Sequence, residues 1–104
     1  MLFVETPLFT RRLAGRLSDD DYRGLQAHLS ANPEAGVLVQ RTGGARKLRW
    51  AEAGRGKSGG CRVLYYFDGA FTCYLLMLYH KSEASDLTEA QRVAIAHLIR
   101  DYLK

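Results

Sequence analysis

The spacing of apolar residues predicts a strand and two helices in the first third of the chain. Residues 1–6 form a short apolar run, and Thr6 precedes Pro7 in the order that caps a helix and fills its first turn. Residues 18–33 open with Ser18 before three aspartates, a typical helix start. Apolar residues then recur at helical spacing until an Asn-Pro pair ends the pattern: Tyr22, Leu25 and Leu29.

The middle of the chain changes to extended segments separated by glycines, at residues 36–40, 45–51, 61–68 and 71–80. The last two segments are rich in aromatic and aliphatic residues, and Asp68-Gly69 between them is a strong two-residue hairpin signal. We expect them to be adjacent antiparallel strands. Their near-continuous hydrophobicity implies burial on both faces or under a helix, so they should form the centre of the sheet.

Residues 87–104 complete the pattern with a helix. Thr88 and Gln91 have the spacing of a capping box, and one face of the helix carries Ile95, Leu98, Ile99 and Tyr102. The element order predicts an α+β fold, a small, twisted, antiparallel-rich sheet with the N-terminal helices and the C-terminal helix packed on one side of it. The length of 104 residues suits a single domain over residues 1–104.

Composition places the chain among ordinary globular proteins, with 47% hydrophobic and 25% charged residues. Its longest apolar runs, VLYYF and YLLMLY, are far shorter than the ~20 residues that span a bilayer, so we expect no membrane segment. No signal-peptide pattern precedes Pro7, and Cys61 and Cys73 do not form a CxxC pair, which favours a cytoplasmic protein over a secreted disulfide scaffold. The sequence leaves open whether the two cysteines lie close together.

Positive charge is concentrated in residues 41–62. This segment holds seven basic side chains against the single acid Glu52, whereas the rest of the chain carries eight basic and ten acidic side chains. The formal net charge of +4 therefore belongs to one segment. A localised cationic surface suits a polyanion such as nucleic acid, and a solvated, solubilising hairpin explains the same composition equally well.

Strand alternation places Lys47 and Arg49 on one face, roughly 7 Å apart along the strand, a spacing that can bracket a phosphodiester. Arg62 enters a segment so apolar that its charge must be paired or lie at the rim of a cleft, because an unpaired buried charge is costly. A cleft position makes Arg62 a candidate catalytic residue. The alternative is a structural salt bridge to Asp86 or Glu83.

The end of the last predicted strand supplies three more candidates, Tyr79, His80 and Lys81. A histidine at such an edge can transfer protons near neutral pH, and it is equally often a half-exposed aromatic residue. Tyr79 could stack against a base, although most tyrosines at strand spacing belong to the core. The histidines are scattered and no HExxH, paired CxxC or acidic cluster of metal-ligand spacing occurs, so we expect no metal site.

With these residues placed, the chain resembles the toxins of the bacterial RelE/ParE toxin–antitoxin superfamily, and most of all the HigB-type branch. The resemblance covers nearly the whole length: VETPLF, LSDDDYRGLQAHLSANPEAG, RTGGARKLRWA, GRGKSGGCRVLYYF, YLLMLYHKSEASDLT and the closing helix. The glycine-lysine-glycine-arginine-tyrosine-tyrosine constellation is followed, after the last predicted strand, by a lysine, a glutamate and the tripeptide Ser-Asp-Leu in KSEASDL. This combination is quite specific to that branch.

The resemblance implies a RelE-like α+β domain that cleaves messenger RNA in the ribosomal A site, inhibiting translation, with no metal or other cofactor. It also implies a cognate antitoxin, often with a helix-turn-helix domain, so that operator DNA is contacted only through the antitoxin complex. An endoribonuclease of this kind, an mRNA interferase, uses the ribose 2′-hydroxyl to attack the adjacent phosphorus. That attack requires a base, an acid, and cations for the charge of the transition state.

Carried onto this sequence, the family's paired strand cations fall on Lys47 and Arg49, and its inward arginine falls on Arg62. Arg62 would hold the scissile phosphate through bidentate donors. Lys47 or Lys57 is the candidate base, because neighbouring cations disfavour the protonated form of an amine.

This chain departs from the RelE pattern after the last strand. That pattern has an arginine and then a tyrosine where Ser82 and Thr88 stand here. Lys81 or His80 could compensate, which leaves the general acid unassigned. Further residues are expected to contact the RNA or the ribosome: Arg41, Arg46, Arg55 and Tyr79.

Two other functions stay open on the sequence alone. One is a ParE-like poison of DNA gyrase, and the other is a noncatalytic RNA-binding module. Arg62 and the clustered lysines favour cleavage over the gyrase poison, because binding to gyrase creates no evident need for an arginine that projects toward a catalytic cleft. A noncatalytic RNA-binding module, in contrast, requires only the positive charge of residues 41–62.

Overall fold

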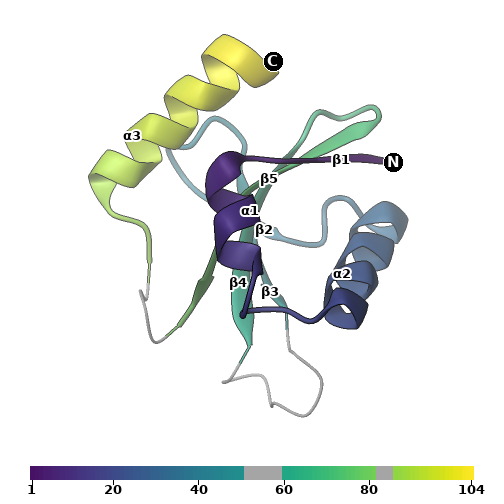
Figure 1. Cartoon of the computed structure of the whole chain (residues 1–104). Coiled ribbons are helices and arrows are strands. Elements are labelled where there is room, and N and C mark those ends of the chain that lie inside the picture. Colours follow the sequence, from purple (N-terminus) through teal and green to yellow (C-terminus); the bar gives the residue numbers. More distant parts are fainter. Residues whose placement is uncertain (51–59, 82–85) are drawn as a thin grey trace.

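The computed structural model describes residues 1–50, 60–81 and 86–104. In chain order the elements are β1 (Leu2–Glu5), α1 (Pro7–Leu13), α2 (Asp19–Ala31), β2 (Val37–Leu38), β3 (Arg46–Trp50), β4 (Cys61–Phe67), β5 (Thr72–His80), α3 (Glu89–Leu98) and its π-helical continuation η2 (Ile99–Leu103). The strands form one sheet in the order β1-β5-β4-β3-β2, with β1 parallel to β5 and the other pairs antiparallel (Figure 1). The predicted α+β fold with a mainly antiparallel sheet is confirmed.

Each helix begins where a side chain satisfies a free backbone N–H, as the sequence predicts. Thr6 Oγ1 accepts a hydrogen bond from the N–H three residues on, and Pro7 occupies the first turn of α1. Ser18 Oγ does the same at the start of α2. At α3, Thr88 and Gln91 exchange both hydrogen bonds of a capping box. These local signals fix where the helices start, independently of how they pack.

The hairpin between β4 and β5 is also confirmed, and Asp68 organises its turn. Asp68 Oδ1 accepts hydrogen bonds from the N–H groups of Ala70 and Phe71, both at 2.9 Å, and of Thr72 at 3.1 Å. These three bonds lower the pKa of the Asp68 carboxyl. Gly69 adopts a φ of 85°, which glycine tolerates without strain. The hairpin places β4 and β5 at the centre of the sheet.

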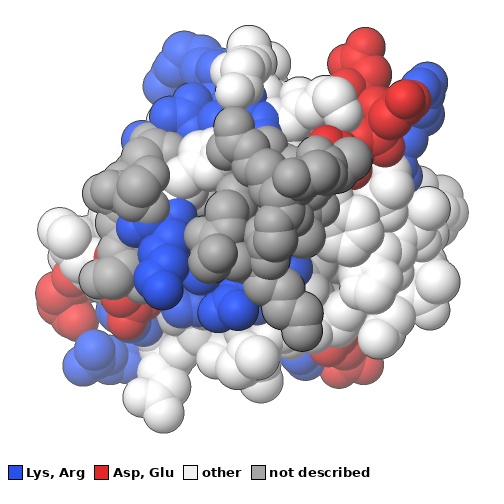
Figure 2. Space-filling model, turned by 90° about the horizontal axis from the view of Figure 1, so that it is seen from below, with Lys and Arg blue, Asp and Glu red and all other residues white. Residues whose placement is uncertain are grey.

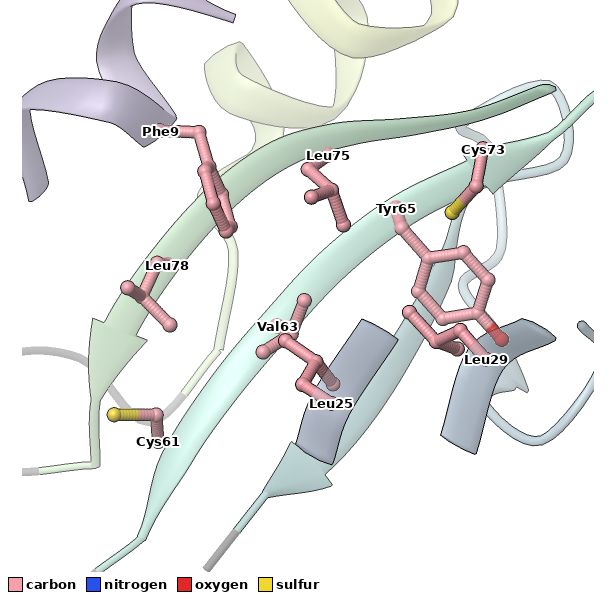
Figure 3. Packing of buried hydrophobic residues seen from close by; sticks show 9 residues of the cluster. All are labelled: Phe9, Leu25, Leu29, Cys61, Val63, Tyr65, Cys73, Leu75 and Leu78. Carbon is pink, nitrogen blue, oxygen red and sulfur yellow. The ribbon is translucent and has the colours of Figure 1, made fainter. Parts of the chain in front are cut away.

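Apolar clusters cover both faces of the sheet. On one face α1 and α2 pack on β4 and β5, and on the other α3 and η2 pack over the same strands. The expectation that all helices lie on one side is therefore wrong, and Figure 1 shows α2 and α3 on opposite sides. The physical reason is that β4 and β5 are apolar on both faces, so each face needs a cover. Figure 3 shows the first cluster: Phe9, Leu25, Leu29, Cys61, Val63, Tyr65, Cys73, Leu75 and Leu78.

A bulge interrupts the pairing of β4 with β5. Leu64 pairs with Met77 whereas Tyr65 pairs with Leu75, so Leu76 has no opposite residue. Leu76 and Met77 consequently both face α3. Beyond the bulge the alternation of β5 is shifted by one residue, and this shift decides which side chains at the end of β5 reach the α3 face.

Among the described residues, none of the helices has the length and hydrophobicity that a membrane span requires, and neither cysteine forms a disulfide. Cys61 pairs with His80, and Cys73 pairs with Phe67 at the other end of β4. The two cysteines are therefore roughly 20 Å apart along the hairpin, six residues at the rise of an extended strand. This separation excludes a disulfide between them.

Candidate functional site

Three adjacent strands bring cationic and phenolic side chains into one row on the α3 face of the sheet. Arg49 of β3 lies directly opposite Arg62 of β4, and Arg62 lies opposite Tyr79 of β5. Residues directly opposite each other in antiparallel strands share a face, with Cβ atoms about 4.5–5.5 Å apart. Lys47 lies two residues before Arg49 and so shares that face. The three cations predicted to converge do so.

The three cations Lys47, Arg49 and Arg62 border an open hollow of about 380 Å³, which we call the first hollow. On the face seen from below in Figure 1, where β3 ends and β4 begins, Lys and Arg side chains gather (Figure 2). The described residues that line the first hollow include four cations and no acid, an arrangement that attracts a polyanion. They are Val37, Lys47, Arg49, Arg62 and Lys81.

Arg62 and Tyr79 are buried side by side, with exposed fractions of only 9% and 1%. Among the described residues, neither Arg62 Nη1 nor Tyr79 Oη has a hydrogen-bond partner. An unsatisfied buried polar atom costs about 1–3 kcal/mol, and a charged one costs more. Two such atoms next to a cationic hollow indicate a position where a bound anion completes the hydrogen bonding.

The structural alternative for Arg62 was a salt bridge to Asp86 or Glu83. Asp86 instead pairs with Lys47 (Nζ to Oδ1, 3.7 Å) and with Arg92 of α3 (Nη2 to Oδ2, 3.2 Å). No ion pair joins Arg62 to Asp86 in the part of the chain that the structure describes. Glu83 lies outside the described residues.

Asp86 acts on the site as a carboxylate. Its pKa is lowered by the 2.8 Å hydrogen bond that Oδ1 accepts from the Leu87 N–H and by the nearby charges of Lys47 and Arg92. Lys47 is thereby engaged in an ion pair with a carboxylate, whereas a general base needs a free amine lone pair. The geometry thus favours Lys47 as a cation that binds and orients an anion.

Tyr79 is held as a neutral phenol. Burial raises its pKa, the charge of Asp86 raises it further, and the charges of Arg62 and Arg92 oppose the rise. A protonated phenol that lacks an acceptor can donate to an oxygen that arrives beside Arg62. Tyr79, predicted only as an RNA contact, is therefore a candidate proton donor of the site.

His80 does not join the row. It lies opposite Cys61, and its Nε2 is 3.8 Å from Cys61 Sγ, on the face that α1 and α2 cover. The candidate catalytic residue His80 therefore lies on the opposite face of the sheet from Arg62, because the bulge in β5 sends Tyr79 rather than His80 to the α3 face. Lys81, the next residue, does line the first hollow.

The remaining candidates are dispersed. Arg46 lies on the opposite face of β3 from Lys47, where its Nη1 donates to the Gly36 carbonyl at 2.8 Å and its Nη2 pairs with Glu34 at 3.0 Å. These contacts give Arg46 a structural role away from the first hollow.

Lys57 and Arg55, the two predicted residues of the glycine-rich loop, lie outside the described residues, as does Ser82. Thr88 caps α3.

Arg41 lines a neighbouring hollow of about 300 Å³, which we call the second hollow. Its backbone has a φ of 62°, in the left-handed region that residues other than glycine rarely adopt. Its guanidinium pairs with Glu89 of α3 at 3.1 Å.

Arg92 also lines the second hollow and donates to the Gln40 carbonyl at 2.8 Å. Sequence reasoning missed Arg92, because only the packing of α3 brings it to this face.

No protein-family model matches the chain. Within the described residues, no group of three or more His, Cys, Asp or Glu side chains is placed to hold a metal ion. Function is therefore inferred from the geometry of the first hollow together with the resemblance that the sequence carries.

Proposed function

We propose that this chain is a toxin of the RelE/ParE superfamily, most like the HigB-type branch, and that it acts as a ribosome-dependent mRNA endonuclease. The observation that carries the proposal is the buried pair of Arg62 and Tyr79, each with an unsatisfied polar atom, in which Arg62 lines a hollow together with three other cations. Such a pair fits one phosphate, because a guanidinium and a phenol both donate hydrogen bonds to phosphoryl oxygens.

In the proposed reaction the ribose 2′-oxygen forms a bond to the adjacent phosphorus, and the bond from phosphorus to the leaving 5′-oxygen breaks. The 2′-hydroxyl gives its proton to a base, and the 5′-oxygen takes a proton from an acid. Arg62, Lys47 and Arg49 stabilise the charge that accumulates on the phosphoryl oxygens. Tyr79 is the candidate acid, and Lys57 stays a candidate base.

The proposal extends to partners. The ribosome and its mRNA supply the substrate, and a cognate antitoxin with a helix-turn-helix domain neutralises the toxin and carries the complex to operator DNA. These partners follow from the resemblance in the sequence, and the cationic face of the sheet is consistent with an RNA substrate. A cytoplasmic location follows from the same proposal.

Primer extension on a defined transcript, with ribosomes present and absent, tests the proposal. We expect cuts in phase with codons only when ribosomes are present. Arg62→Ala should abolish these cuts, and Arg62→Lys, which keeps the charge without the planar fork, should reduce them about 10²- to 10³-fold. Arg23→Ala, which removes an exposed arginine of α2, is the control and should cut normally.

Three results would count against the proposal. An intact message together with trapped gyrase–DNA complexes would support a gyrase poison instead. Bound but uncut RNA would support a noncatalytic binding module. Full cleavage by a folded Arg62→Ala protein would remove Arg62 from the mechanism, with folding checked by circular dichroism.

A further inference from the structure

The second hollow adjoins the first, because Val37 and Lys47 line both. It lies between β2 and the start of α3, whose Arg92 reaches across to the Gln40 carbonyl. A nucleotide consists of a phosphate and a base joined through one ribose. Two hollows that share a wall can therefore hold the two ends of one nucleotide.

The charges of the two hollows differ. The described residues of the first hollow include no acid, whereas every cation of the second has an acidic partner. Lys47 and Arg92 both pair with Asp86, and Arg41 pairs with Glu89. A phosphate in the second hollow would meet the Asp86 carboxylate at close range, which is repulsive. The second hollow thus suits an uncharged group.

Part of the wall of the second hollow is apolar and open. Val37 of β2, which shares the face of Lys47, is 73% exposed, a high value for a valine that borders a polar space. Leu38, the other residue of β2, pairs with Arg46 and so belongs to the opposite face of the strand. Strand β2 has only these two residues, and it pairs with β3 along one edge. An exposed apolar wall beside polar groups is the usual lining of a site for a flat, uncharged ring such as a nucleobase.

Asp86 supplies the polar group that can distinguish one base from another. Its side chain is 55% exposed, and a carboxylate has about four acceptor positions, of which the Leu87 N–H and Arg92 occupy two, while Lys47 lies at the longer ion-pair distance of 3.7 Å. A remaining position can accept a hydrogen bond from an amino group of a base. It repels a base that presents a carbonyl oxygen at the same place.

We propose that the second hollow binds the base of the nucleotide whose phosphate contacts Arg62, and that Asp86 selects an amino-bearing base over uracil. The inference rests on the proposed function, because it takes an RNA phosphate to occupy the first hollow. It assigns a part in substrate choice to β2 and to the start of α3.

Cytidine 3′-monophosphate and uridine 3′-monophosphate provide the test, because their bases differ by an amino group in place of a carbonyl oxygen. Each is titrated into the full, 15N-labelled chain and followed by amide chemical shifts, with inorganic phosphate as the reference probe. We expect cytidine 3′-monophosphate to bind about tenfold more tightly than the uridine nucleotide. Both nucleotides should shift the amides of Gln40 and Arg41, which line only the second hollow, and phosphate alone should shift those near Arg62.

Asp86→Asn should bring the ratio of the two affinities close to one, because an amide offers uracil a donor and cytosine an acceptor. Asparagine can still accept the Leu87 N–H bond, so the variant should fold, and its affinity for inorganic phosphate should not fall. Val37→Ser should weaken both nucleotides by the same factor, so that the ratio of their two affinities stays that of the wild-type chain. Asp86→Asn thus tests whether the site selects one base over another, whereas Val37→Ser tests whether either base contacts the second hollow at all.

Equal affinities in the wild-type chain, or a preference that survives Asp86→Asn, would overturn the base site. If phosphate shifts the amide of Arg62 while neither nucleotide shifts Gln40 or Arg41, the base site is wrong and the phosphate site of the proposed function stands. If phosphate does not bind and ribosome-dependent cuts are absent, both fail. A cytidine preference without ribosome-dependent cuts would retain the base site and reject the nuclease.

Discussion

The hydroxyl of Tyr79 lies in a position that is unfavourable until a ligand arrives. It is buried beside Arg62, and no acceptor for it occurs among the described residues. Because burial and Asp86 raise its pKa, the phenol keeps its proton at neutral pH. An RNA phosphate beside Arg62 would bring acceptor oxygens within reach of this donor and relieve the unfavourable burial of both groups.

Tyr79→Phe removes this donor and little else. We expect the rate of ribosome-dependent cleavage to fall by about 10²- to 10⁴-fold, the usual contribution of a positioned proton donor. The free energy of unfolding should stay the same or rise, because the lost hydroxyl has no partner to leave unsatisfied. Single-turnover cleavage on programmed ribosomes and urea denaturation measure the two effects. Undiminished cleavage by the variant would exclude Tyr79 as the acid.

At the same residue scale, the sequence predicts some members of the site and misplaces others. Lys47 and Arg49 could be placed on one face from alternation alone, because they belong to one regular strand. Tyr79 and His80 could not be distinguished, because the bulge at Leu76 shifts the alternation of β5 by one residue. Nothing in an uninterrupted run of apolar residues marks where such a bulge falls.

At the scale of elements, Tyr65 connects the central strand to the segment that precedes β2. Its hydroxyl donates to the Pro33 carbonyl at 2.8 Å and accepts a hydrogen bond from the Gly36 N–H at 2.9 Å. A Cβ at Gly36 would come within 2.9 Å of the Tyr65 ring, so only glycine fits there. This connection holds β2, and with it Val37, beside the two hollows.

Tyr65→Phe leaves a partly buried carbonyl and a buried N–H without their partner. We expect the free energy of unfolding to fall by about 1–3 kcal/mol, the cost of leaving buried polar groups unsatisfied. Chemical denaturation measures the change, and Tyr102→Phe, at a position 80% exposed, should change stability by less than about 0.5 kcal/mol. Equal stability of the two variants would show that the connection contributes nothing to the fold.

The elements themselves show which sequence signals suffice. Helix starts at Thr6, Ser18 and Thr88 and the turn at Asp68 depend on residues within a few positions of one another, so local patterns predict them. The face on which α3 packs depends on β4 and β5, which are apolar on both sides. Amphipathic spacing shows that α3 has an apolar face to bury. It does not show on which face of the sheet that helix packs.

At the scale of the whole molecule, charge is distributed unevenly. The net charge of +4 combines a strongly cationic segment with a slightly acidic remainder. The structure brings three cations of that segment, Lys47, Arg49 and Arg62, together around the first hollow. Lys81, which directly follows the last residue of β5, lines the same hollow. A field of this kind, concentrated at one end of the sheet, orients a polyanion before any specific contact forms.

The salt dependence of RNA binding separates this focused charge from net charge. Each phosphate contact on a single strand contributes about 0.7 to the slope of log affinity against log salt concentration. Removing Lys47 and Arg49 together by alanine substitution should therefore lower the slope by about 1.4, measured by fluorescence anisotropy with a single-stranded oligoribonucleotide. Removing Arg11 and Arg23, both exposed on the N-terminal helices, changes net charge equally and should leave the slope unchanged. An equal loss in both double variants would mean that net charge alone attracts the RNA and that the strand cations do not contact it.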